Sequence, residues 1–112
     1  MTAPFAGMWS QASAVRPTSL EPLTATTGES TLRHVRVRMA IVLADGEPAD
    51  VVDSRTAVLQ DELLQKVSTM EADELRGEEG SNALRAHLTA AALEIWGDEV
   101  VRRVVLTELL VQ

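Results

Sequence analysis

The chain has 112 residues, of which 46% are hydrophobic and 24% charged. This is the size and composition of one soluble globular domain. Seventeen acidic and ten basic residues give a net charge of −7, which argues against a nucleic-acid binder because phosphate contacts need clustered Lys and Arg. The chain contains no cysteine, which excludes a disulfide framework, a Cys-ligated zinc and a thiol nucleophile.

Residues 1–19 are rich in Ala, Ser, Thr and Pro and show no sustained period, which predicts a flexible tail or linker before a domain at 20–112. The tail has no basic lead of a signal peptide, and no stretch of the chain approaches the roughly 18–20 apolar residues that span a bilayer. The chain as given is therefore expected to be soluble. Phe5, Met8 and Trp9 would share one face of a helix. They form a candidate docking tail, although a frayed end is the simpler interpretation.

Residues 20–44 are expected to form a β-hairpin. The Thr-rich run at 20–27 contains Pro22, which an edge strand tolerates. The next run alternates strictly and predicts a strand with one buried and one polar face. Its apolar face is expected to hold Val35, Val37, Met39, Ile41 and Leu43, and its polar face His34, Arg36, Arg38 and Ala40.

The period then becomes helical from about Ala49. Ser68 and Glu71 have capping-box spacing and predict the start of a short helix, Ser81 is expected to cap a second long helix, and Gly97 to end it. The expected buried stripes are Val52, Leu59, Leu63, Val67 and Met70 in the first helix, and Leu84, Leu88, Ala91, Ala92 and Ile95 in the second.

The segment Val100–Gln112 is rich in Val and Leu on both faces, which favours a closing strand. The elements therefore predict a two-layer α+β domain of β-β-α-α-β order, with helices packed on one face of a small antiparallel or mixed sheet. Val37, Leu63, Leu88 and Val105 are expected to share its interior.

The sequence has no Gly-rich phosphate loop, no G-x-S-x-G elbow and no H-E-x-x-H motif. We therefore expect no catalytic residue, no cofactor and no metal. The two histidines, His34 and His87, fall on different elements and are most simply surface residues. The alternative is a stand-alone ligand-binding or enzymatic α+β domain, which would need a pocket with polar groups near one of these histidines.

Charge is unevenly distributed along the chain. Residues 45–99 hold fourteen acidic and four basic side chains, whereas the predicted strands at 31–44 and 100–112 carry a net charge of +4. Such a bipolar module can stack head to tail with copies of itself. Alternatively, the arginines solubilise the sheet and pair locally with helix carboxylates. The candidate oligomer contacts are Arg36, Arg38, Arg102 and Arg103 on the sheet, against Glu71, Asp73 and Glu74 on a neighbour.

Three segments in a fixed order carry a family resemblance: Leu20–Leu23, Arg33–Ile41 and Val104–Gln112. They are similar to the Leu-Glu-Pro-like strand, the R-x-L-K-V-x-I-A-L strand and the closing V-x-F-T-x-F-V-x-Q run of the flagellar basal body-associated FliL family. The resemblance covers residues 20–112 and concerns the C-terminal domain of that family. Leu106 and Leu109 stand where the family has phenylalanine.

This resemblance implies a non-enzymatic part of the bacterial flagellar motor with a stomatin-type (SPFH-like) fold. Its expected partners are copies of itself, in a ring, and the flagellar stator proteins, in support of torque, swarming and chemotactic motility. The family domain lies on the periplasmic side of the inner membrane, behind an N-terminal membrane-spanning helix. We therefore expect membrane association only through an anchor that this chain does not contain.

Overall fold

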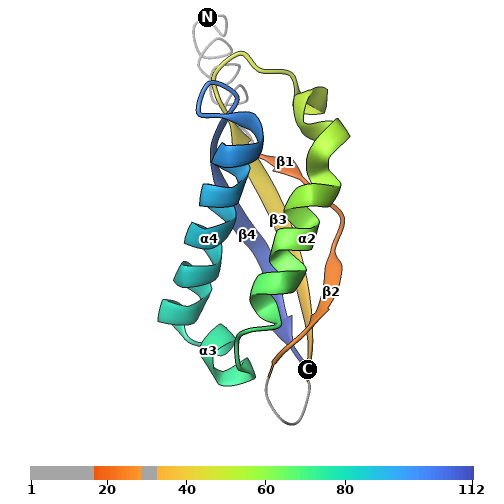
Figure 1. The fold of residues 1–112 in the computed structure, drawn as a ribbon, viewed down its shortest axis with the longest axis vertical. Helices are drawn as coiled ribbons and strands as arrows, with labels where there is room; N and C mark the ends of the chain where they lie inside the picture. The colour runs from red at the N-terminus through yellow and green to blue at the C-terminus, as the bar shows by residue number, and fades with distance from the viewer. Residues whose placement is uncertain (1–16, 29–32) are drawn as a thin grey trace, which may run out of the picture.

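The computed structural model describes residues 17–28 and 33–112, which form an α+β domain with a small antiparallel sheet (Figure 1). Helices α2 and α4 lie side by side over one face of the sheet, and α3 lies at the end where the chain's C-terminus is found. In chain order the elements are β1 (Thr18–Ser19), β2 (Leu23–Thr26), β3 (His34–Leu43), the 3-10 helix η1 (Ala49–Arg55), α2 (Thr56–Val67), α3 (Ala72–Arg76), α4 (Glu78–Trp96) and β4 (Val101–Val111).

Strand β3 is the centre of the sheet, and each described pairing is antiparallel. Strands β1 and β2 share one side of β3, and β4 pairs with the other side. Of the expected strand at 20–27, the structure keeps β2, and β1 forms in the last two residues of the predicted tail; Pro22, which has no N–H to donate to a ladder, lies between the two strands. The register of β4 against β3 shifts after Arg38 and again after Val42.

The predicted buried stripes meet in one core. The five alternating apolar residues of β3 are at most 4% exposed, and the helical stripes pack against them. Ile95 lies partly buried at the margin of this core. The helical members are Val52, Leu59, Leu63, Val67, Leu84, Leu88, Ala91 and Ala92, and Met70 packs with them from the connection between α2 and α3.

Two residues of the sheet lie elsewhere than expected. Ala40 is on the outer face but fully buried, because its small side chain is flanked by Ser19 of β1 and Val105 of β4. Val105 is on that outer face and only partly buried, while Val104 takes the expected place in the core. The cause is the irregularity beside Arg38, since an extra residue in one strand changes which positions of β4 face inward.

The start of α3 differs from the prediction by three residues. The capping box is formed by Glu71 at the N-cap and Glu74 at N3, rather than by Ser68 and Glu71. The Glu74 carboxylate accepts the N–H of Glu71 at 2.8 Å. Ser68 instead ends α2, and its hydroxyl donates to the carbonyl of Gln65 at 2.6 Å. A carboxylate at the N-cap satisfies free N–H groups as a serine does, so the motif signal alone could not choose between them.

Helix α4 also begins earlier than expected. It starts at Glu78, directly after Gly77, and Ser81 lies within its first turn, where its hydroxyl donates to the carbonyl of Glu78 at 3.1 Å. The predicted end is confirmed: Gly97 follows the helix with φ +85° and donates its N–H to the carbonyl of Leu93. This left-handed backbone favours glycine, and it turns the chain into β4.

Candidate interaction surfaces

The outer face of the sheet is the side on which no described helix packs, and three of the predicted arginines lie there. Arg36 and Arg38 come from β3 and Arg103 from β4. The Nε of Arg36 lies 3.4 Å from Oε1 of Glu108, which lies diagonally across on β4 and directly opposite Arg38. Arg38 and Arg103 have no ion pair within the described part of the chain. Of these two cations, Arg103 is exposed and Arg38 is partly buried.

Arg102 lies farther along the sheet, next to the turn that follows β3. Its Nη2 is 3.6 Å from Oδ2 of Asp45. Together with Arg103 these two residues line a shallow hollow of about 420 Å³. The four arginines therefore form two groups along the sheet: Arg36 and Arg38 toward one end, and Arg102 and Arg103 toward the other. Local pairing holds for Arg36 and Arg102, but the carboxylates belong to β4 and to a turn rather than to the helices.

The predicted acidic contacts gather on α3. Glu71, Asp73 and Glu74 are all exposed. Asp73 accepts a hydrogen bond from Nη1 of Arg76 at 2.9 Å, and Glu74 completes the capping box. Part of this acidic cluster therefore stabilises its own short helix, while its carboxylates remain accessible to solvent.

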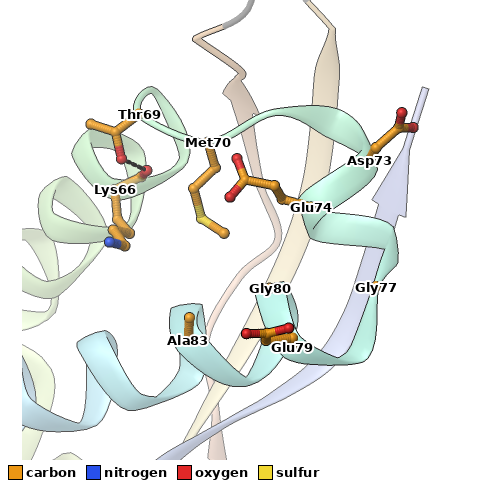
Figure 2. A pocket seen from close by; sticks show the side chains of 9 residues that line it. All are labelled: Lys66, Thr69, Met70, Asp73, Glu74, Gly77, Glu79, Gly80 and Ala83. Carbon is orange, nitrogen blue, oxygen red and sulfur yellow. Dashed lines mark hydrogen bonds between the residues drawn. The ribbon is translucent and has the colours of Figure 1, made fainter.

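A cleft of about 530 Å³ opens beside this cluster, between the end of α2, α3 and the start of α4 (Figure 2). Glu74 and Glu79 contribute its carboxylates, and Lys66, the only lysine of the chain, contributes an ammonium; the Asp73 carboxylate points away from the cleft (Figure 2). Gly80 lines the cleft as well, and a Cβ at this position would overlap the carbonyl oxygen of Glu74. Glycine at this position therefore lets α3 and α4 approach closely.

The two histidines are not brought together. His34 begins β3, whereas His87 on α4 places Nε2 3.2 Å from Oε1 of Glu62 on α2. Neither histidine lines one of the two hollows described above. Across residues 17–28 and 33–112, no three metal-ligating side chains are arranged to hold an ion.

Thr89 is a structural contact that sequence reasoning missed. Its hydroxyl accepts the N–H of Val104 at 3.0 Å and faces the carbonyl of the same residue at 3.4 Å. Helix α4 thereby satisfies both backbone groups of one β4 residue on the side that faces away from β3. No local sequence signal identifies this contact, because it joins residues on two separate elements.

The candidate docking residues Phe5, Met8 and Trp9 lie outside the described residues. Among the helices that the structure describes, none combines the length and the apolar character needed to cross a membrane.

The fold and its surfaces define a small α+β domain whose main features are an open, arginine-bearing sheet face and an acidic helical end. The family model for the flagellar basal body-associated protein FliL matches residues 18–112. The chain belongs to this family, and membership implies a role in association with the flagellar basal body. No curated protein matches the chain in a sequence search.

Proposed function

We propose that this protein is a non-enzymatic scaffold of the flagellar basal body that assembles with copies of itself in a ring around stator units. In this role it supports motor torque, swarming and chemotactic motility from the periplasmic side of the inner membrane. The proposal includes a stomatin-like (SPFH-like) arrangement of the domain. Membership of the FliL family supports the basal-body association, and the surface charges support the assembly.

The observation that carries the proposal is the separation of unpaired cations from accessible carboxylates. Arg38 and Arg103 lie on the open sheet face without an ion pair among the described residues. The carboxylates of Asp73 and Glu74 lie at the helical end, beside the cleft. A sheet face of one copy can therefore meet the acidic end of the next, and a heterologous contact of this kind closes into a ring when its rotation permits.

The alternative, a ligand-binding or enzymatic domain, has less support. The cleft volume falls within the range of small-molecule sites. Its lining, however, is acidic, with Met70 and Ala83 as its apolar side chains, and both histidines lie elsewhere. A basic side chain of a neighbouring copy suits this lining better than a neutral metabolite does.

A charge-swap experiment tests the assembly. We expect Arg38→Glu and Asp73→Arg each to weaken self-association, and an equimolar mixture of the two variants to restore it, because each reversed surface then meets an opposite charge. Sedimentation velocity at low salt measures the species present. The association should weaken in about 0.5 M NaCl, where the Debye length is only a few ångströms. A mixture no better associated than the single variants would contradict the proposed contact.

The cellular role is tested separately. A chromosomal deletion should reduce swarming, and a fluorescent fusion of the full-length gene product should collect at flagellar bases. The Arg38→Glu variant should reach the motor less often than the wild type while its expression stays equal. Full swarming in the deletion strain would contradict the flagellar function without bearing on self-association.

A further inference from the structure

Strand β4 has one unpaired side. Among the described strands it pairs with β3 alone. The N–H of Gln112 donates to the carbonyl of His34 at 2.9 Å. In an antiparallel ladder, residues alternate between pointing their backbone groups toward and away from the partner strand. The N–H and C=O groups of Leu109 and Val111 therefore point away from β3, toward the open side.

The two halves of this side differ. The hydroxyl of Thr89 hydrogen-bonds to both the N–H and the carbonyl of Val104, so α4 prevents another strand from pairing with this part of β4. The backbone at 109–111 has no such partner among the described residues, and it carries neither a proline nor a charged side chain. Natural sheets usually protect a long edge with one of these devices.

The side chains of the open half are also incompletely covered. Leu110, on the outer face, is 50% exposed, and Leu109 and Val111 on the inner face are only partly buried. An edge with free backbone groups and apolar side chains on both faces is a surface to which another strand can add.

We propose that the open half of β4 binds the same segment of a second copy, antiparallel and about a two-fold axis at Leu110. The sheets of two copies then continue into each other through β4. This inference deepens the self-association proposed above and rests on it, but it uses a different surface from the arginine and carboxylate contact.

The segment is complementary to itself in one register. When Leu110 faces Leu110 of the second copy, Leu109 faces Val111 and Glu108 faces Gln112. Leu109 of one copy and Val111 of the other then form hydrogen-bonded pairs, which use the backbone groups left free in the single copy. The side-chain amide of Gln112 can donate to the Glu108 carboxylate of the other copy. Side chains that meet belong to the same face, as a sheet requires. A shift by two residues would instead place the Glu108 carboxylate against Leu110.

A cysteine experiment tests this register directly, because the natural chain has no cysteine. Directly opposed residues of a non-hydrogen-bonded antiparallel pair have Cα atoms about 4.5 Å apart, which falls in the disulfide range of about 4.4–6.8 Å. Leu110→Cys should therefore give a covalent dimer under mild oxidation. Val58→Cys is the matched control, since Val58 on α2 is 51% exposed but lies away from this edge. It should remain monomeric.

Two further variants test the association without a covalent bond. Leu110→Lys brings two ammonium groups together at the axis and should weaken the dimer about tenfold or more, whereas Val58→Lys should leave it unchanged. Because this contact consists of backbone hydrogen bonds and apolar side chains, about 0.5 M NaCl should not weaken it. The arginine-mediated association should weaken under the same condition, so the two contacts fail independently.

Equal disulfide yields from Leu110→Cys and Val58→Cys would overturn the strand-pairing proposal. A dimer that persists in Leu110→Lys with unchanged affinity would overturn it as well. Loss of association in Arg38→Glu, with full crosslinking of Leu110→Cys retained, would support the strand contact. If both the crosslink and the salt-sensitive association are absent, self-association as a whole is wrong, whatever the flagellar role.

Discussion

The two halves of β4 belong to one strand but differ in what surrounds them. At the first half, Val101 and Val104 are fully buried, and Thr89 of α4 occupies the backbone groups of Val104. At the second half, Leu109 and Val111 on the same inner face are only partly buried, and no described strand pairs with the side of β4 that faces away from β3. On the inner face, therefore, side chains are fully buried and the backbone edge is satisfied where α4 contacts β4, and both protections weaken toward residues 109–111.

The largest expected effect breaks the covered half. Leu88→Ala removes a fully buried side chain of α4 from the core and should lower the free energy of unfolding by about 2–5 kcal/mol. Leu110→Ala should lower it by less than about 1 kcal/mol, because half of that side chain is already in water. Urea denaturation of both variants measures the difference. Equal losses would show that Leu110 contributes to stability as a buried residue does, despite its exposure.

A smaller effect should follow from the contact that protects Val104. Thr89→Val keeps the side-chain shape but leaves the N–H and carbonyl of Val104 without their partner, which should cost about 1–3 kcal/mol. The Val104 amide should also exchange faster with solvent deuterium. Thr89→Ser retains the hydroxyl and is the matched control. Unchanged exchange at Val104 in Thr89→Val would mean that the Thr89 hydroxyl does not protect the backbone of β4 from solvent.

The smallest effect is expected at the ion pair beside the covered half. Arg102→Ala removes the contact with Asp45, in which both side chains are more than half exposed. Exposed pairs contribute little, so stability should change by about 0.5 kcal/mol or less. Thermal unfolding at low and high salt checks this. A loss above 2 kcal/mol, well beyond the usual range for exposed pairs, would show that the turn after β3 depends on this arginine.

Much of the fold could be predicted from periodicity. The alternation in β3 predicted its buried face, and the helical stripes predicted most residues that pack on it, because side-chain direction follows the repeat of the element. The prediction failed where the repeat is interrupted. Val105 was expected in the core and Val104 occupies it, since the irregularity between β3 and β4 has no signature in composition.

The candidate surfaces were predicted less completely. The uneven charge placed arginines on the sheet and carboxylates on the helices, and the structure locates Arg36 and Arg38 on its open face. The sequence could not show that Arg36 and Arg102 have carboxylate neighbours, nor which side of β4 is unpaired. Both depend on how distant segments meet. The apolar character of both faces at 109–111 was a visible signal, but it was equally compatible with a strand enclosed on both sides.

The opposite border of the sheet limits how far such assembly can extend. There β3 is met by two short strands, β1 and β2, with Pro22 between them and Pro17 just before β1. Prolines offer no N–H to an incoming strand, and a broken border gives it no continuous template. The proposed strand addition at β4 therefore has no matching template at this border from which to propagate from pair to pair, which protects the sheet against fibre growth.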